Sequence, residues 1–315
     1  MNDTRLAVIA IGGNSLISDP QHQAVEDQYE STRTATRHIA DLIDSGYRVV
    51  ITHGNGPQVG FILLRSQAAK KVIHEIPVDS AGADTQGGIG YHIQQTLGNE
   101  LRRRGTLRPI TTIITQVLVD GEDKCFKAPD KPIGVFYSAA EAEALAAERG
   151  WTMVEDSGRG WRRVVPSPSP LEIIEFDAIN ALVEAGVLVV AVGGGGIPVV
   201  RDADGDLHGV AAVIDKDRAS SLLANKLGAL DLIISTAVEK VCLNFRTPQE
   251  RTLDHCTLDE MKGYLLEGHF APGSMKPKIE AAIQFLENGG ERVIICTPDT
   301  IAEAAAGVRG TTITK

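Results

Sequence analysis

The chain has 315 residues, of which 43% are hydrophobic, and its 41 acidic residues outnumber its 31 basic residues to give a net charge of −10. A chain of this length can bury about 75% of the surface that its unfolded form exposes, so we expect a folded protein with a large core. Binding to polyanions requires clustered Lys and Arg, and the acidic balance therefore argues against a nucleic-acid partner.

The N-terminal segment MNDTRLAVIAIGGN does not have the pattern of a signal peptide, because its apolar run is short and is followed at once by a glycine pair. The longest apolar run, Gly186–Val200, contains four consecutive glycines and is too short to span a bilayer. We therefore expect a cytoplasmic protein with no membrane partner. No CxxC spacing occurs, which favours reduced cysteines in or near the core over a zinc site or a redox pair.

Short apolar strands alternate with helices along the chain. In chain order the sequence predicts a strand at Leu6–Ile11, helix Gln23–Ser45, strand Tyr47–Thr52, helix Pro57–Ala69, strand Pro109–Val119, helix Leu171–Ala185, strands Val187–Val192 and Asp231–Ser235, helices Thr257–Glu267 and Lys278–Asn288, and strand Glu291–Cys296. Continuous apolar strands separated by helices indicate a parallel sheet that is buried on both faces. The predicted fold class is α/β, doubly wound.

Two segments depart from this alternation. Asp120–Pro170 is rich in Asp, Gly and Pro but contains a helix-like stretch at Ala139–Arg149. Bare loops of that length are uncommon, so we expect an insertion with a small structure of its own. Arg201–Val213 carries Asp204-Gly205 between β-like flanks, which predicts a hairpin turn.

Three of the predicted strands end in glycine-rich turns. The first ends in Gly12, Gly13 and Asn14, the second in Gly54, Asn55 and Gly56, and a later one in a run that includes Gly194 and Gly195. Ligands of open α/β sheets bind at the carboxyl ends of the strands, and glycine lets backbone N–H groups approach an anion closely. One such turn can serve strand–helix geometry alone, but three together favour an anion site. No Walker sequence is present, so the phosphate-binding loop differs from a P-loop.

A set of motifs, in chain order, resembles the carbamate kinases of the amino acid kinase family. The motifs are AIGGNSL at Ala10–Leu16, HGNGPQVG at His53–Gly60, KPIGVFYS at Lys131–Ser138, RRVVPSPSP at Arg162–Pro170, GGGGIPV at Gly193–Val199, AVIDKDRAS at Ala212–Ser220 and APGSMKPKIEAA at Ala271–Ala282. They cover nearly the whole chain, and their combination is specific although no single motif is.

The resemblance implies a three-layer αβα sandwich around a mainly parallel central sheet, with a small protruding inserted subdomain. It implies one amino acid kinase domain over residues 1–315. The N-terminal lobe, about 1–185, would bind the acid and carry a lid-like insertion at about 120–170, and the C-terminal lobe, about 186–315, would bind the nucleotide. Members of this family are typically homodimers.

The implied reaction is reversible phosphoryl transfer between ATP and carbamate, with Mg²⁺ bound to the nucleotide. Carbamate is scarce and unstable in water, so formation of ATP from ADP and carbamoyl phosphate is the plausible direction. Two alternatives stay open: a kinase for another small carboxylate, and an inactive nucleotide-binding regulator descended from such a kinase.

The family pattern implies roles for several residues. Lys216 would face the transferring phosphoryl group, Asp217 would orient the lysines, Lys278 would hold nucleotide phosphates, and Lys131 would reach in from the insertion to replace a first-strand lysine, whose place is taken here by Ile11. The glycine turns named above, with Asn14 and Asn55, would bind substrate and phosphate. Nucleotide-binding residues would be Thr236, Ala237, Val238, Ser274, Met275 and Lys278.

Each of these assignments has a simpler structural alternative. A lysine flanked by aspartates is commonly a solvated surface triplet, Pro277–Lys278 is compatible with a helix start, and Lys131 with an exposed loop. Thr236–Val238 is nearly as compatible with ordinary packing at a strand end. For His53, a structural hydrogen bond at the end of its strand is preferred over a catalytic role.

Overall fold

A computed structural model of the protein describes residues 5–13, 24–156, 158–271 and 273–315. Its main sheet has eight strands. From one edge to the other they are β15 (His255–Thr257), β17 (Thr311–Thr314), β16 (Arg292–Cys296), β12 (Asp231–Ser235), β1 (Leu6–Ile11), β2 (Arg48–His53), β9 (Leu188–Val190) and β3 (Ile110–Thr112). All neighbouring pairs are parallel except β16 and β17. The prediction of a mainly parallel central sheet is confirmed.

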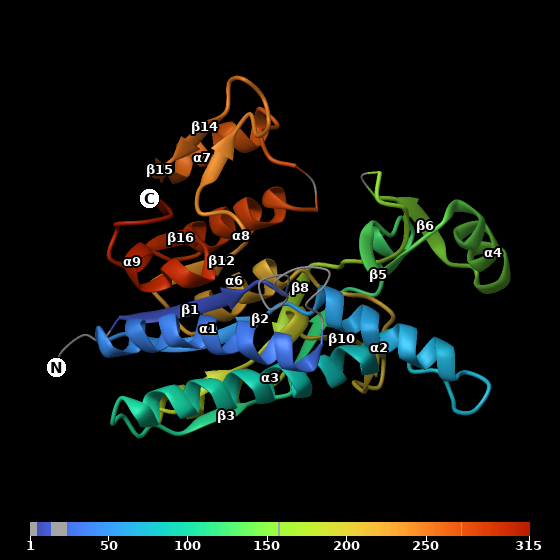
Figure 1. The fold of residues 1–315 in the computed structure, drawn as a ribbon, viewed down its shortest axis with the longest axis horizontal. Helices are drawn as coiled ribbons and strands as arrows, with labels where there is room; N and C mark the ends of the chain where they lie inside the picture. Colours follow the sequence, from blue (N-terminus) through green and yellow to red (C-terminus); the bar gives the residue numbers. More distant parts are fainter. Residues whose placement is uncertain (1–4, 14–23, 157, 272) are drawn as a thin grey trace.

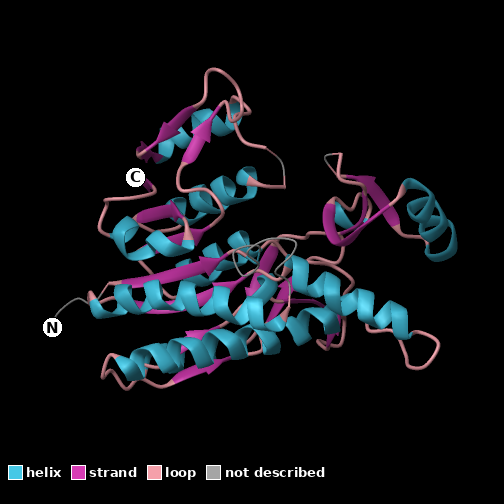
Figure 2. Ribbon diagram, in the orientation of Figure 1, coloured by secondary structure: helices cyan, strands magenta, loops and turns pink. Residues whose placement is uncertain are grey.

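Helices cover both faces of this sheet (Figures 1 and 2). One face packs against α1 (Val25–Asp44), α3 (Val78–Arg103) and α9 (Ile301–Ala305); the other packs against α5 (Phe176–Glu184), α6 (Lys216–Lys226), α7 (Leu258–Leu266) and α8 (Met275–Glu287). The alternation of side chains along β1 shows why. Ala7 and Ile9 pack in the core under α1, α3 and α9, whereas Val8 packs in the core under α5, α6, α7 and α8. Side chains of a strand point to opposite faces in turn, so an entirely apolar strand requires cover on both.

A smaller sheet of four strands lies beside the main one, with the order β11-β10-β4-β8. Its strands are β4 (Gln116–Val119), β8 (Pro170–Ile173), β10 (Ile197–Arg201) and β11 (Leu207–Gly209). β10 and β11 pair antiparallel around Asp204-Gly205, which confirms the predicted hairpin. A further hairpin joins β13 (Val241–Leu243) to β14 (Arg251–Leu253).

Two predicted elements are wrong. Pro109–Val119 is not one strand, because the chain leaves the main sheet after β3 and enters the smaller sheet as β4. The break comes at Thr115, whose backbone N–H donates to the Gln86 side chain and whose C=O accepts both from that side chain and from Ile197 N–H of β10. Leu171–Ala185 is not one helix, since its first part pairs with β4 as strand β8 and only the remainder forms α5.

The segment predicted as an insertion contains a sheet of its own, with the order β5-β7-β6. It is formed by β5 (Lys131–Tyr137), β6 (Thr152–Glu155) and β7 (Trp161–Val165), and α4 (Ala139–Arg149) packs against it. Figure 1 shows these elements on the right, away from the main sheet. They rest on α2 (Gly56–Ala69), where a Cβ on Gly60 would lie 2.7 Å from Gly134 Cα. The two backbones therefore touch directly.

Helix α3, at 26 residues, was not predicted. Its glycines disfavour a helix by roughly 1 kcal/mol each, and they hide the helical pattern in the sequence. One of them, Gly90, has a packing reason, because a Cβ there would lie 2.3 Å from the side chain of Thr112 in β3. Helix α8 begins at Met275, three residues before the predicted start, and places Pro277 in its first turn, where no intrahelical N–H bond is lost.

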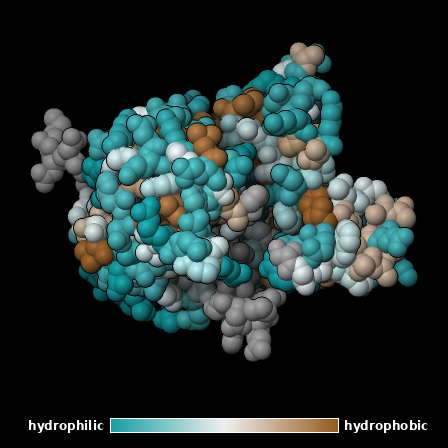
Figure 3. Space-filling model, turned by 90° about the horizontal axis from the view of Figure 1, so that it is seen from above, coloured by the Kyte–Doolittle hydropathy of each residue, from teal (hydrophilic) through white to brown (hydrophobic). Residues whose placement is uncertain are grey.

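The surface seen from above is mostly hydrophilic, with small separated hydrophobic areas (Figure 3). Within the described ranges, no helix has the length and apolar composition needed to cross a membrane.

Candidate active site

The ends of β1 and β2 bring the first two glycine turns together. Gly12 N–H donates to Ser235 O at the end of β12 (3.1 Å), and Gly54 N–H donates to Ile11 O (2.8 Å). A Cβ on Gly54 would lie 2.8 Å from Gly13 N, so the two turns approach too closely for any side chain there. Asn14, the remaining residue of the first predicted turn, lies outside the described residues.

The third glycine turn faces the second. Gly194, at φ 68°, packs so closely on Asn55 that a Cβ there would lie 2.3 Å from Asn55 Nδ2. Gly195, at φ 95°, is equally close to Ile214 O, at 2.4 Å. Asn55 is the residue before α2, and Gly56 is the first residue of that helix. Apart from Asn14, the structure thus gathers the predicted substrate-side residues at the carboxyl ends of the strands.

Helix α6 begins at Lys216 and carries a lysine–carboxylate pair into the site. Asp217 is 1% exposed, and its two carboxylate oxygens bond to Lys216 Nζ and, at 3.1 Å, to Lys278 Nζ from the first turn of α8. A Cβ on Gly54 would lie 3.0 Å from Lys216 Cδ, so this lysine extends along the glycine turns. The burial contradicts the alternative that Asp215–Asp217 is a solvated surface triplet.

Asp215 joins the inserted sheet to this cluster, a role that the sequence analysis missed. One carboxylate oxygen accepts a hydrogen bond from Lys131 Nζ of β5 at 2.7 Å. The other caps α6 by accepting from the N–H groups of Asp217 (2.9 Å) and Arg218 (3.4 Å). Asp directly before a helix is a recognised N-cap signal, so the cap could have been found from the sequence, although the partner lysine could not.

Opposing effects act on the pKa values of these groups. Burial alone would raise the pKa of Asp215, but the charges of Lys131, Lys216 and Lys278 outweigh it and the pKa is lowered. Burial lowers the pKa of Lys216, against the attraction of Asp217. For Lys278, burial acts in the same direction, but the nearby aspartates prevail and its pKa is raised. Perturbation of several neighbouring groups is typical of functional sites.

His53 at the end of β2 makes the local hydrogen bond that was predicted. Its ring is buried, and Nδ1 donates a hydrogen bond to Gly54 O at 3.1 Å. Burial, with a smaller contribution from the charge of Lys216, lowers the pKa of His53 to about 4. The imidazole is therefore neutral at neutral pH and adds no charge beside the lysines.

The predicted nucleotide-side residues lie at two neighbouring strand and helix ends. Thr236 follows β12, and its N–H donates to Cys296 O at the end of β16 (2.8 Å). Ser274 is exposed and immediately precedes α8, which begins at Met275; its carbonyl oxygen lies 3.5 Å from Lys278 Nζ. Ala237 is exposed and Val238 is half-buried.

The electrostatics of the site favour anions. Helices α2, α6 and α8 all begin at the cluster, and a helix N-terminus carries roughly half a positive charge. Lys131, Lys216 and Lys278 add three cations against the two carboxylates of Asp215 and Asp217. Glycine turns, helix N-termini and lysines together can hold the phosphate groups of a nucleotide and a second small anion.

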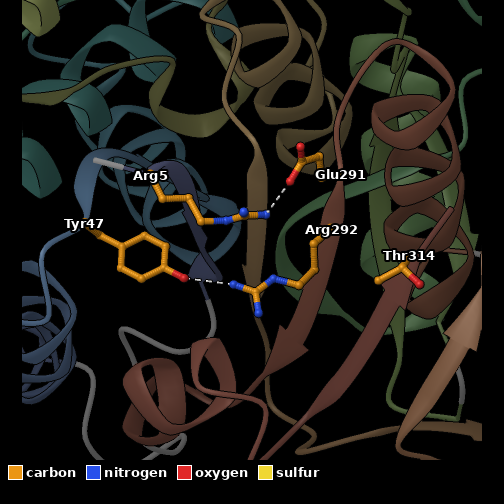
Figure 4. Close-up of a pocket in the computed structure, with 5 residues that line it drawn as sticks. All are labelled: Arg5, Tyr47, Glu291, Arg292 and Thr314. Carbon is orange, nitrogen blue, oxygen red and sulfur yellow. Dashed lines mark hydrogen bonds and ion pairs between the residues drawn. The ribbon is translucent and has the colours of Figure 1, made fainter. Parts of the chain in front are cut away.

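A hollow of about 400 Å³ at the opposite end of the sheet does not fit an anion as well (Figure 4). It is lined by Arg5, Tyr47, Glu291, Arg292 and Thr314. Both arginines are already engaged by carboxylates: each bonds to the buried Asp231, and Arg5 also bonds to Glu291 at 3.0 Å. This end of the sheet is a charge-paired structural cluster.

Comparisons with known proteins agree with this geometry. A carbamate kinase of Thermococcus kodakarensis is 50% identical over 311 residues, which cover 98% of each chain. A carbamate kinase-like protein of Escherichia coli is 49% identical, over 98% of this chain and 99% of the relative. Among solved structures, carbamate kinase from Giardia lamblia bound to AMP-PNP superposes with a TM-score of 0.92 at 43% identity, over 100% of both chains. The model of the amino acid kinase family matches residues 5–297. The chain therefore belongs to the amino acid kinase family.

Proposed function

We propose that the protein is a carbamate kinase, which transfers a phosphoryl group reversibly between ATP and carbamate. The observation that carries the proposal is the cluster of Lys131, Lys216 and Lys278 beside the glycine turns and the starts of α2, α6 and α8. The choice of carbamate as the acid rests on the full-length similarity to carbamate kinases.

The proposed mechanism requires positioning and charge neutralisation more than covalent chemistry. Carbamate is already an anion, so no general base is needed to generate the nucleophile. Two unit negative charges 4 Å apart repel by about 4 kcal/mol at an effective dielectric of 20, and cations must offset this. Lys216 would stabilise the transferring group, Lys278 the nucleotide phosphates and Lys131 the acid side, with Asp217 and Asp215 holding the lysines in place.

Mg²⁺ would enter bound to the nucleotide. The carboxylates of Asp215 and Asp217 are both paired with lysines, so they are not free to hold a metal ion before the nucleotide binds. Among the described residues, no group of three or more His, Cys, Asp or Glu side chains could hold a metal ion. The ion would neutralise phosphate charge, while the residues of the chain bind and orient the Mg²⁺–nucleotide complex.

The test is a coupled assay of ATP formation. Purified protein supplied with Mg²⁺, ADP and carbamoyl phosphate should produce ATP, and excess EDTA should abolish the reaction. Acetyl phosphate and N-acetylglutamyl phosphate, which carry other small acids, serve as competing phosphoryl donors. Robust turnover of another donor without turnover of carbamoyl phosphate would support a kinase for a different acid. Nucleotide binding without turnover of any donor would support the inactive regulator.

We also propose that the protein is a homodimer, as carbamate kinases typically are, and that it acts in the cytoplasm. A surface is available at the edge of the main sheet, where β3 is the terminal strand and exposed apolar side chains include Tyr91 (57%) and Leu107 (85%). Light scattering of the protein as it elutes from a size-exclusion column should give about twice the monomer mass of 33.6 kDa. A monomer mass at micromolar concentration would contradict the dimer.

A further inference from the structure

Two consecutive residues of α3, Thr85 and Gln86, form hydrogen bonds with the turns after β2 and β9. Thr85 is 2% exposed and Gln86 is 1% exposed, and both direct their polar atoms toward the site rather than toward solvent. Polar groups buried this completely are normally retained for the hydrogen bonds that they make. The partners of these two side chains are the turn after β2 and the turn after β9.

Thr85 fixes the side chain of Asn55. Its hydroxyl donates to Gly82 O (2.6 Å) within the helix and therefore accepts from Asn55 Nδ2 (2.8 Å). Since a hydroxyl has one proton, this arrangement settles which end of the Asn55 amide carries nitrogen. The amide plane is also confined by Gly194, whose Cα packs against it. Asn55 thus cannot rotate while Thr85 keeps its hydroxyl.

Gln86 holds the opposite turn. Its Nε2 donates to Gly193 O (2.9 Å) and Thr115 O (3.0 Å), and its Oε1 accepts from Thr115 N–H (2.7 Å). Thr115 in turn accepts a hydrogen bond from Val192 N–H at its Oγ1 (3.0 Å). Three hydrogen bonds of one buried amide thus connect the β3–β4 break with the Gly193–Gly195 turn.

The turn held by Gln86 is strained. Val192 has φ 53°, a left-handed conformation that is a true outlier for a β-branched residue. Strained backbone persists only where the surroundings determine it, and such sites cluster where ligands bind. The hydrogen bonds through Thr115 and Gln86 supply that constraint for Val192 and Gly193.

We propose that Thr85 and Gln86 are positioning residues, which set the spacing and orientation of the Gly54–Gly56 and Gly193–Gly195 turns for the acid substrate. This inference rests on the proposed function. The two residues touch no reacting atom; Thr85 acts through the Asn55 amide, and Gln86 through the backbone of the strained turn. The predicted nucleotide-binding residues lie in the turn after β12 and at the start of α8. Among the described residues, no hydrogen bond connects them to the side chain of Thr85 or Gln86.

The test compares Thr85→Val with Thr85→Ser in the ATP-forming assay. Valine keeps the shape of threonine but removes the hydroxyl, whereas serine keeps the hydroxyl. We expect Thr85→Val to lower kcat/KM for carbamoyl phosphate about 10-fold, the scale of one lost hydrogen bond, with the KM for ADP nearly unchanged. Thr85→Ser should retain wild-type values. Should Thr85→Val fold poorly, Thr85→Ala removes the same hydroxyl without placing a methyl group against Asn55.

A double-mutant cycle with Asn55→Ala separates positioning from general packing. If Thr85 acts through Asn55, Thr85→Val should cause no further loss in the Asn55→Ala background. Gln86→Met provides a second arm and should also affect carbamoyl phosphate more than ADP. An equal loss from Thr85→Val in both backgrounds, or unchanged kinetics in an active wild-type background, would overturn the inference. Absence of activity in the wild type would instead refute the proposed function.

Discussion

Replacement of Lys216 by alanine should lower kcat by roughly 10²–10³-fold, the scale of losing one preorganised electrostatic donor. The lysine lies among the glycine turns and is held by Asp217, which is itself buried. Charge that is fixed before the reaction stabilises the transition state without reorganisation. Only interactions that strengthen in the transition state accelerate the step, so nucleotide affinity should change far less than kcat.

Two other lysines provide the comparison for Lys216→Ala. Lys278→Ala should raise the KM for ADP as well as lower the rate, because Lys278 lies beside the carbonyl of Ser274, where nucleotide phosphates are expected. Lys276→Ala should change little, since this side chain is 46% exposed and its nearest carboxylate partner, Glu280, is 3.9 Å away. Steady-state kinetics on folded variants measure all three. Near-normal turnover of Lys216→Ala would show that Lys216 has no part in phosphoryl transfer.

Replacement of Asp231 by asparagine should lower the free energy of unfolding by about 3–5 kcal/mol, the cost of removing one partner from a buried ion pair. Its carboxylate is fully buried and accepts four hydrogen bonds: from Arg5 at 2.7 and 2.8 Å, and from Arg292 at 3.1 and 2.9 Å. Asparagine would turn an N–H₂ group toward these donors and leave two guanidinium groups without their main anion. Chemical denaturation measures the loss.

The pH dependence of this effect has a definite sign. Burial acts to raise the pKa of Asp231, but the hydrogen bonds from Arg5 and Arg292 prevail and the pKa is lowered. A lowered pKa gives stability that is present above the unfolded value, near 3.9, and is lost as pH falls toward the folded value. The wild type should therefore have a higher free energy of unfolding than Asp231→Asn at neutral pH, and this difference should disappear below about pH 4.

A matched control is Glu291→Gln in the same cluster. Glu291 pairs with Arg5 but is 55% exposed, and exposed pairs contribute at most about 1 kcal/mol. Because the cluster is at the end of the sheet opposite the glycine turns, both variants should retain wild-type KM values when folded. An Asp231→Asn protein as stable as Glu291→Gln would contradict the assigned strength of the buried pair.

The predicted fold was most accurate where the sequence had a single interpretation. Strand Leu6–Ile11 is apolar at every position and is buried at every position, and helix Ala139–Arg149 begins at a Ser138 cap and ends at Gly150 in the left-handed region. Errors arose where tertiary contacts determine the outcome. At Thr115 the predicted strand is interrupted where Gln86 from α3 and Ile197 from β10 bond to its backbone, and no local pattern contains that information.

The candidate site shows the same division. The family resemblance is confirmed, and it identified Lys131, Lys216, Asp217 and Lys278 as a set, which the structure brings together through Asp215 and Asp217. Sequence spacing could not pair Lys131 with Asp215, which are separated by 84 positions. The supports of the glycine turns were likewise hidden, because they belong to a helix whose glycines concealed it.

The lysine–carboxylate pairs have a consequence for how ligands enter and leave. Lys131, Lys216 and Lys278 each have an aspartate partner already, so at the proposed site an arriving phosphate oxygen would exchange with a carboxylate instead of neutralising an unpaired buried cation. Such an exchange would give less net binding energy than the binding of phosphate to unpaired lysines. It also means that a departing product would leave each lysine with a carboxylate partner. Both effects suit an enzyme that works in either direction, because neither the substrates nor the products would bind too tightly to dissociate.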